Sequence, residues 1–470
     1  MKLEIHKVFL FVALAWGLIT VFIIPPFEVM DEQRHYIRAG AIAEGVWGCV
    51  DGKLKISEKK ISLIGYSELG RIAFHKDQKF DFSRILNYRE PETSGLVSVN
   101  GLCNTFPLGH AIAAVGIKLG DTVNNQLLGF YLGRISNLLV SVLIVCLAIK
   151  TIPLAKKTVF FLGLIPTATL FYSSVGYDGL ILSSSFLMSA YSIRLNCRRK
   201  EGISWKEIIT FFIIASPLAF IKPVYLPIVL ASLFLVYFKM GIKQKFFILI
   251  SFLALVLGVI FYLTHIFTLS YQLERIEMDA SLKEQYFLET ESTVRNTSGY
   301  VYDTSFQVQR ILSEPTHFFS SMLYSIIIFF DGYLLTMLGI TGWGGYSLRL
   351  SVYALILFNA VILVGQDVGK IKLSKFLSPS LFYTVLVSFV LIFASMYIFD
   401  TPKNIEVPIV LGVQGRYFLP LLLPLFLALQ SAAKRKFLWL ETNKAKWLVV
   451  VIQALVILGT IESYIGRYYV

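Results

Sequence analysis

The fold class of this chain is decided by the stretch VFLFVALAWGLITVFII at 8–24 and by the PPFEVMDEQRH that follows at 25–35. The apolar stretch carries no charged residue and, as a helix, is long enough to cross a hydrocarbon core of roughly 30 Å. Pro25 and Pro26 end it, because proline has no amide hydrogen to donate and fixes its own backbone angle. No small-residue cleavage site follows, so we expect an uncleaved membrane anchor. Ionisable side chains then crowd the membrane edge, where they are costly and usually functional.

The composition of the whole chain extends this interpretation. Of 470 residues, 56% are hydrophobic and only 16% are charged, and the mean hydropathy is +0.68. Comparable apolar stretches recur, which indicates a multi-pass protein of the bacterial inner (cytoplasmic) membrane, in contact with the lipid bilayer. The net charge of +13 does not indicate a nucleic-acid partner, because Lys and Arg gather in the short segments between apolar stretches, as the positive-inside rule describes.

The charge pattern predicts an all-α membrane protein, a single polytopic domain over 1–470 with about eleven transmembrane helices. Two long segments, 25–126 and 267–347, balance their basic residues with acids and are expected on the extracytoplasmic side. We expect both to be structured, the first with interfacial helices over 31–44 and 106–119. The expected spans are roughly 8–24, 127–149, 158–174, 177–193, 207–221, 223–238, 246–266, 348–364, 377–399, 416–432 and 447–466.

The apolar segment 318–338 does not fit this topology, because a crossing there would place Lys370, Lys372 and Lys375 outside. We expect it to form a re-entrant or interfacial helix within the second long segment. Asp331 and the Gly-Trp-Gly-Gly run at 342–345 favour a buried break over a lipid-facing span.

Two of the four cysteines, Cys49 and Cys103, lie in the first long segment. If that segment faces an oxidising periplasm, they either form a disulfide or remain two free thiols, and the sequence does not choose between these. No CxxC or HxxxH spacing typical of a metal site is present.

The acid cluster after the first span is the leading candidate for catalysis. If 31–40 is helical, Asp31, His35 and Arg38 fall near one face. Arg34 lies beside that face, and Glu32 lies on a neighbouring one. A carboxylate next to an imidazole is suited to taking a proton from a hydroxyl, so we assign the two acids and the imidazole to catalysis and the two arginines to substrate binding. The alternative is a solvated helix start, where acids simply favour the helix dipole.

A second acid, Asp178, follows Tyr177 at the start of an expected span. Its structural interpretation is a helix cap, whereas its functional interpretation is a substrate-orienting group or a metal ligand that shares a site with Asp31. His110, on an apolar face of the second interfacial helix, is more often structural than catalytic. We count it, with Tyr177 and Asp178, among the substrate-binding candidates.

Two cations stand at the same expected edge of the membrane. Lys222 precedes Pro223 and Tyr225, and Arg416 lies between Gln414 and Tyr417. Arg binds phosphate through a forked pair of donors and Lys binds it as a point charge, so both suit a lipid phosphate at headgroup depth. The alternative is snorkelling of terminal cations toward lipid headgroups. Tyr225, Gln414 and Tyr417, which accompany these cations, complete the substrate-binding candidates.

These motifs resemble, in the same order and over nearly the whole chain, those of a bacterial polytopic family catalogued as a domain of unknown function with a PPF…DE..H opening. The matching stretches are PPFEVMDEQRH at 25–35, GYD at 176–178, KPVY at 222–225 and QGRYFLP at 414–420. That family is in turn similar to the type C (GT-C) integral-membrane glycosyltransferases. Met30 and Gln33 depart from the small or proline residues expected there, but the acids are untouched.

The resemblance to the GT-C enzymes implies a GT-C-like helical bundle with two large extracytoplasmic loops, an essential acid in the first loop, and a polyprenyl-phosphate-linked sugar donor. We therefore expect an inverting membrane glycosyltransferase in which Asp31 is the general base and the acceptor is a cell-surface polysaccharide or a lipid-linked glycan. No nucleotide motif is present and no cofactor is required, although the acids leave room for a divalent metal. The alternatives are a transporter or flippase of lipid-linked saccharide and a surface-polysaccharide polymerase.

Overall fold

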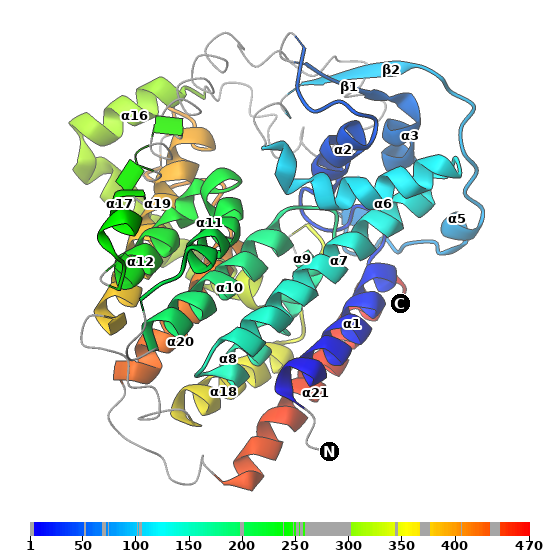
Figure 1. The fold of residues 1–470 in the computed structure, drawn as a ribbon. Coiled ribbons are helices and arrows are strands. Elements are labelled where there is room, and N and C mark those ends of the chain that lie inside the picture. Colours follow the sequence, from blue (N-terminus) through cyan, green and yellow to red (C-terminus); the bar gives the residue numbers. More distant parts are fainter. Residues whose placement is uncertain are drawn as a thin grey trace.

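The computed structural model describes residues 4–470 except 51–52, 68–71, 74, 101, 103–105, 198–201, 238, 248, 251–252, 254–256, 259–301, 344–345, 367–376, 406 and 433–441. The described part is mainly helical. Long helices run side by side in a tilted bundle, and short helices and strands gather at one end of it (Figure 1). The expected span 246–266 and the first half of the segment 267–347 fall largely outside the described residues.

The elements follow the apolar stretches of the sequence closely. The first third of the chain forms α1 (Ile5–Ile23), α2 (Glu32–Ala43), β1 (Lys53–Ser57), α3 (Glu58–Tyr66), α5 (Ser83–Leu86), β2 (Leu96–Asn100), η1 (Pro107–Gly109), α6 (Ala111–Thr122) and α7 (Gln126–Thr151). The middle forms α8 (Lys156–Leu162), α9 (Pro166–Tyr172), α10 (Asp178–Cys197), α11 (Trp205–Phe220), η2 (Pro223–Tyr225) and α12 (Leu226–Tyr237). The last third forms α16 (Thr304–Ser313), α17 (Pro315–Leu338), β3 (Ile340–Thr341), β4 (Tyr346–Ser347), α18 (Leu350–Gln366), α19 (Leu377–Phe399), η3 (Gly415–Phe418), α20 (Leu419–Ala432) and α21 (Asn443–Tyr468).

The prediction of an all-α multi-pass membrane protein is confirmed, but the count of about eleven spans is not. Within the described residues, six helices are long and apolar enough to cross a membrane: Ile5–Ile23, Gln126–Thr151, Pro315–Leu338, Ser378–Phe399, Gly415–Ala432 and Trp447–Tyr468. Two shorter apolar helices, Pro223–Tyr237 and Leu350–Gly365, correspond to expected spans. The strands form two small antiparallel sheets of two strands each, β1 with β2 and β3 with β4.

The shortfall has local causes. The expected span 158–174 is divided into α8 and α9, because Pro166 begins a new helix and cannot continue the hydrogen bonds of the previous one. α10 is 20 residues long but rich in serine, which makes it less apolar than a typical span. α11 has only 16 residues and holds Pro217 near its end.

The segment expected as a re-entrant or interfacial helix at 318–338 forms α17, which by length and composition is also a candidate membrane span. α17 covers Pro315–Leu338 but is kinked at Phe329, where the backbone angles are non-helical. Asp331, expected in a buried break, is exposed. The kink at Phe329 lies two residues before Asp331, close to where the break was expected, and the re-entrant or interfacial placement stays a prediction.

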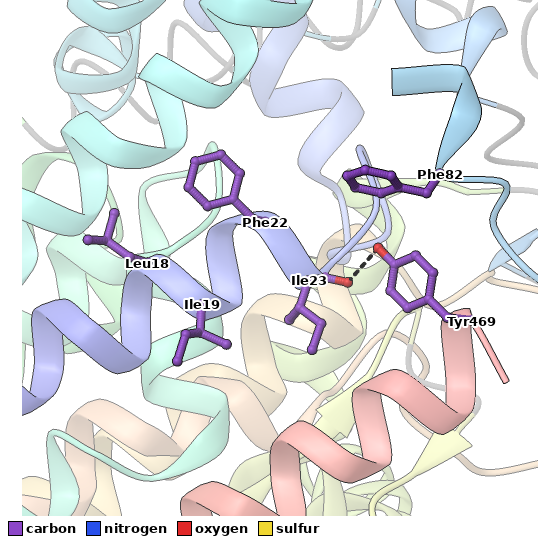
Figure 2. A pocket seen from close by; sticks show the side chains of 6 residues that line it. All are labelled: Leu18, Ile19, Phe22, Ile23, Phe82 and Tyr469. Atoms are coloured by element: carbon purple, nitrogen blue, oxygen red, sulfur yellow. Dashed lines mark hydrogen bonds between the residues drawn. The ribbon is translucent and has the colours of Figure 1, made fainter. Parts of the chain in front are cut away.

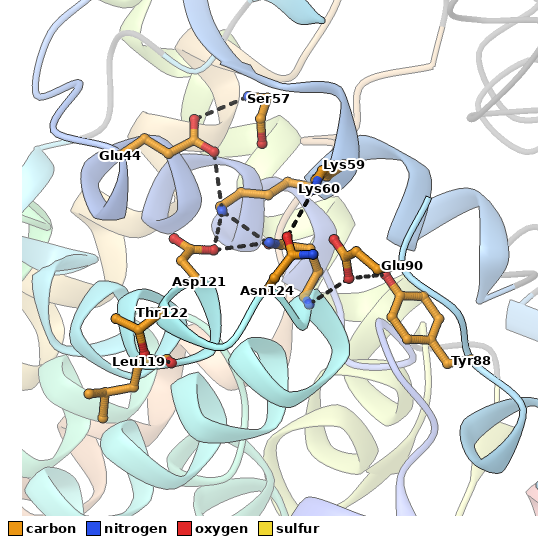
Figure 3. A network of polar contacts seen from close by, with 11 residues as sticks. Glu44, Ser57, Lys59, Lys60, Tyr88, Glu90, Leu119, Asp121, Thr122 and Asn124 are labelled. Atoms are coloured by element: carbon orange, nitrogen blue, oxygen red, sulfur yellow. Dashed lines mark hydrogen bonds and ion pairs between the residues drawn. The ribbon is translucent and has the colours of Figure 1, made fainter. Parts of the chain in front are cut away.

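The segment 25–126 is folded and joined to the bundle by a buried polar network (Figure 3). Its centre is Lys60 of α3, only 1% exposed. The Lys60 ammonium lies 3.2 Å from a Glu44 carboxylate oxygen and 2.7 Å from Asp121, and donates to the Gln126 side-chain oxygen at 3.0 Å. A lysine is tolerated at this depth because two carboxylates and an amide satisfy it. The network thus connects α2 and α3 with the α6–α7 corner.

α6 and α7 pack through glycines that allow their backbones to touch. A Cβ atom on Gly116 would overlap the Leu132 carbonyl, and one on Gly120 would overlap Gly129. Small residues at a helix interface permit this close approach. α6, expected as an interfacial helix at 106–119, is therefore attached along the start of α7.

Of the cysteines in the described residues, Cys49 is disulfide-bonded, whereas Cys146 and Cys197 have free thiols. Cys103, the partner that the sequence allows, lies outside the described residues. The outcome favours the disulfide over two free thiols in the segment 25–126.

Candidate functional site

Four ionisable side chains from four separate segments meet in one cluster. Asp31 precedes α2, Asp178 begins α10, Lys222 precedes η2, and Arg416 lies on η3. Arg416 Nη2 donates to Asp31 Oδ2, and Arg416 Nη1 lies 3.4 Å from Asp178 Oδ2. Lys222 Nζ lies 3.4 Å from Asp178 Oδ1. Positions 31 and 416 are 385 residues apart in the chain, so tertiary folding alone creates this arrangement of two carboxylates and two cations.

Asp31 lies at the end of a turn before α2 whose backbone conformation is unusual. Asp31 has a φ of 61° and Phe27 a φ of 66°. Both lie in the left-handed region, which Asp tolerates because its short side chain is accommodated there, whereas Phe adopts it only when the surroundings require it. The Trp343 indole donates to the Phe27 carbonyl oxygen at 3.1 Å and supports the turn from the β3–β4 side.

A buried ion pair holds this turn against α7. Arg134 donates to Glu32 Oε1 at 2.8 Å and to Oε2 at 2.6 Å, and both side chains are 0% exposed. The same guanidinium donates to the carbonyl oxygens of Val21, Ile24 and Pro25 at 2.8, 2.7 and 3.0 Å. Glu32 Oε1 also accepts from the Val175 amide at 2.8 Å. Glu32, expected in the catalytic group, thus lies outside the cluster, where it ties α2, α7 and the α9–α10 turn together.

Arg416 is placed by a close contact between η3 and α17. A Cβ atom on Gly415 would overlap the Tyr333 carbonyl oxygen, so only glycine allows this approach. The Gly415 amide donates to the Thr336 hydroxyl at 2.9 Å. The Gln414 side-chain oxygen is buried and has no hydrogen-bond partner.

Aromatic rings line the cations. Lys222 Nζ lies 4.0 Å from the ring centre of Tyr417 and 5.7 Å from that of Tyr177. The Arg416 guanidinium carbon lies 5.2 Å from the Tyr417 ring centre. The Tyr225 hydroxyl donates to the Tyr417 backbone carbonyl oxygen at 2.8 Å and so helps to hold Tyr417 in place. Such rings stabilise cations through their negative faces and leave hydrogen-bond donors free for an anion.

Two histidines extend the cluster on the Asp31 side. His35 Nδ1 and His110 Nε2 lie 2.9 Å apart and share a hydrogen bond, and the His35 ring packs edge-on against Tyr177 at 4.7 Å between ring centres. Burial lowers the pKa of His35 to about 4, although the nearby Asp178 and Asp31 oppose this shift. Burial and the His35 ring lower the pKa of His110 as well. The pair is therefore neutral at physiological pH.

The cluster opens to solvent on the Asp31 side. The Asp31 side chain is 36% exposed, against 17% for Asp178, 16% for Lys222 and 4% for Arg416. Burial favours the neutral form of Asp31, but the charge and the hydrogen bond of the Arg416 guanidinium, with a smaller contribution from Arg34, outweigh burial and lower the pKa of Asp31 to about 2. The pKa of Lys222 is also lowered, by burial, although Asp178 opposes this shift.

The remaining expected site residues lie apart from these contacts. Arg34 is exposed beside Asp31. Arg38 is buried and donates to the Trp47 carbonyl oxygen at 2.8 Å, so it supports the fold of the segment 25–126.

Two buried groups were given no role by reasoning from the sequence. Arg134 stands alone in an otherwise apolar span, and an ionisable residue there is itself a functional signal that could have found it. Glu28 is 1% exposed, and neither of its carboxyl oxygens has a hydrogen-bond partner. Burial raises the pKa of Glu28 to about 8, although Arg467 opposes this shift. No pattern of sequence spacing distinguished Glu28 from Asp31.

Among the described residues, no group of three or more His, Cys, Asp and Glu side chains could hold a metal ion. A divalent cation would have only Asp31 and Asp178 as anionic ligands here, and cationic side chains contact both.

A separate apolar groove lies between α1 and the end of α21 (Figure 2). It is lined by Leu18, Ile19, Phe22, Ile23, Phe82 and Tyr469. The Tyr469 hydroxyl donates to the Ile23 carbonyl oxygen at 3.0 Å across its edge. Its lining offers no acid, no base and no fixed charge.

A family model described as "Predicted membrane protein (DUF2142)" matches residues 14–425, a range that contains all four ionisable residues of the cluster. No curated protein and no solved structure matches the chain.

Proposed function

Starting from the fact that this chain belongs to the DUF2142 family of predicted membrane proteins, we propose that it is an inverting glycosyltransferase of the GT-C type. The observation that carries the proposal is the convergence of Asp31, Arg416, Asp178 and Lys222 in one partly exposed cluster. A base and a pair of phosphate-binding cations within a few ångströms of one another are what sugar transfer from a lipid phosphate requires.

The proposed donor is a polyprenyl-phosphate-linked sugar. Its phosphate would be bound by Arg416, whose planar guanidinium suits two phosphate oxygens, and by Lys222 as a point charge. Tyr417 and Tyr177 hold Lys222 without consuming its hydrogen-bond donors. The buried Gln414 oxygen, which has no partner, is available for a sugar hydroxyl.

The proposed reaction is a single displacement at the anomeric carbon. The hydroxyl oxygen of the acceptor forms the new bond to this carbon as Asp31 takes the hydroxyl proton. The bond from the anomeric carbon to the phosphate oxygen breaks, and the electron pair leaves with the polyprenyl phosphate. Arg416 and Lys222 stabilise the charge that develops on this leaving group. The atoms and charges balance without a nucleotide, and a divalent cation is an addition that this chemistry admits but does not need.

The cellular setting is part of the proposal. We place the protein in a bacterial inner membrane, with the cluster on the extracytoplasmic side and a cell-surface polysaccharide or lipid-linked glycan as acceptor. The basic segments between the apolar stretches support this orientation.

The test is transfer of radiolabelled sugar from synthetic polyprenyl-phosphate monosaccharides to endogenous acceptor in membranes that contain the protein. Asp31→Asn should lower the rate on the order of a hundred- to ten-thousand-fold, the usual contribution of a general base. Asp303→Asn is the matched control, because Asp303 pairs with Lys403 in an exposed contact of α16 and should be neutral. Movement of intact lipid-linked saccharide without transfer would instead favour a flippase, and full transfer by Asp31→Asn would remove Asp31 as the base.

A further inference from the structure

The two carboxylates of the cluster balance the charges of its two cations. One terminal nitrogen of Arg416 donates to Asp31, the other lies near Asp178, and Lys222 also lies near Asp178. Two carboxylates therefore occupy the positions around the two cations that a phosphate would need. An additional anion can bind strongly to such a balanced set only if a carboxylate gives up its place.

We propose that the donor phosphate enters the site by displacing Asp31 from Arg416, so that donor binding itself releases the base. This inference rests on the proposed function, because it assigns an order to the binding of donor and acceptor in the same site. The donor phosphate binds first, and only then is the Asp31 carboxylate free to face an acceptor hydroxyl.

Of the two carboxylates, Asp31 is the one that can leave. Its side chain is 36% exposed, and its direct ion-pair partner is Arg416. Asp178 is less exposed at 17%, lies near both Lys222 and Arg416, and stands at the N-terminus of α10, where the helix dipole favours a negative charge. Displacing Asp31 therefore breaks fewer interactions and returns its carboxylate to solvent.

Arg416, by contrast, stays in place during the exchange. It is 4% exposed, its backbone belongs to η3, and its guanidinium faces Tyr417 and Phe171. Its Nη1 also lies 3.5 Å from the Met30 carbonyl oxygen. The Arg416 guanidinium thus stays in place, and one anion can replace another as its partner.

The exchange also explains how a carboxylate beside an arginine can act as a base. While paired, Asp31 has a pKa of about 2 and holds a proton weakly. Transfer of Arg416 to the phosphate removes the largest influence that lowers the pKa, and the proton affinity of Asp31 rises when the donor is bound. A base activated only in the donor complex would act on an acceptor and not on the empty site.

The experiment measures binding of farnesyl phosphate, a short polyprenyl phosphate, to the full-length detergent-solubilised protein by titration calorimetry at pH 7. Asp31→Asn removes the competing charge and should bind on the order of tenfold more tightly than the unaltered protein. Asp303→Asn should bind like the unaltered protein, Arg416→Gln should lose binding, and farnesol, which lacks the phosphate, should not bind. Asp31→Gly serves as a second variant, since glycine also tolerates the left-handed backbone at 31.

Equal or weaker binding by both Asp31 variants would overturn the exchange, as would an absence of farnesyl phosphate binding in every protein. The outcome is separable from that of the proposed function. Tighter binding without any sugar transfer would support the exchange and count against the glycosyltransferase, whereas transfer that depends on Asp31 without tighter binding would do the reverse.

Discussion

Replacement of Glu28 by Gln should stabilise the protein in a way that depends on pH. Glu28 lies in the turn that ends at Asp31, is 1% exposed, and has no hydrogen-bond partner for either carboxyl oxygen. The charged groups that affect it are Arg467, Glu32 and Arg134. Gln has nearly the same shape as protonated Glu but cannot ionise, so the variant isolates the effect of the charge.

The magnitude follows from the difference between the two pKa values. The pKa of Glu28 is about 8 in the folded protein, against 4.5 for an ordinary glutamic acid. Between these values the folded protein keeps the proton while the unfolded chain releases it. A rise in pH therefore favours unfolding by about 1.4 kcal/mol per pH unit. At pH 7 the accumulated penalty is roughly 3 kcal/mol, and above pH 8 it levels off.

The assay is thermal unfolding of the detergent-solubilised protein, followed by intrinsic fluorescence at pH 5, 6, 7, 8 and 9. The two midpoints should nearly coincide at pH 5 and separate steadily up to pH 8, with Glu28→Gln the more stable. Midpoint curves that run parallel from pH 5 to 8 would refute the claim that a neutral carboxylic acid is buried at this position.

Two further predictions concern the elements that place the cluster. Arg134→Leu should lower the free energy of unfolding by about 3–5 kcal/mol, because Glu32 would remain buried without its partner. Adding Glu32→Leu should restore part of the thermal midpoint. A normal midpoint for Arg134→Leu alone would contradict a stabilising role for the buried Arg134–Glu32 ion pair. Gly415→Ala should push η3 away from the Tyr333 carbonyl and weaken farnesyl phosphate binding at least about tenfold. Gly466→Ala is the control and should bind farnesyl phosphate normally, because the added methyl group meets open space.

The core of the candidate cluster could be predicted from the sequence. Asp31, Asp178, Lys222 and Arg416 each stand next to the end of an apolar stretch, and helix ends on one side of a membrane lie at similar depth. Position at a helix end predicts the depth of a residue in the bilayer. It does not predict which residues at that depth are in contact, since contact depends on how the helices pack.

Glu32 illustrates this limit. It is adjacent to Asp31 and of the same chemical type, yet its carboxylate points to Arg134 on α7, 102 positions along the chain, whereas Asp31 points to Arg416. Neighbouring residues at a helix start face different directions, and the partner in each direction comes from distant sequence. The spans fared similarly: their apolar composition was predictable, whereas the division before Pro166 and the kink of α17 at Phe329 depended on packing.

The glycine seam between α6 and α7 restricts the routes by which large molecules could reach Asp31. Where two backbones are in contact at Gly116 and Gly120, no sugar chain can pass between them. In the glycosyltransferase that we propose, the acceptor glycan would therefore enter from the exposed side of the cluster, at Asp31 and Arg34. Crosslinkers placed on that flank, rather than along the seam, are the ones that should capture it.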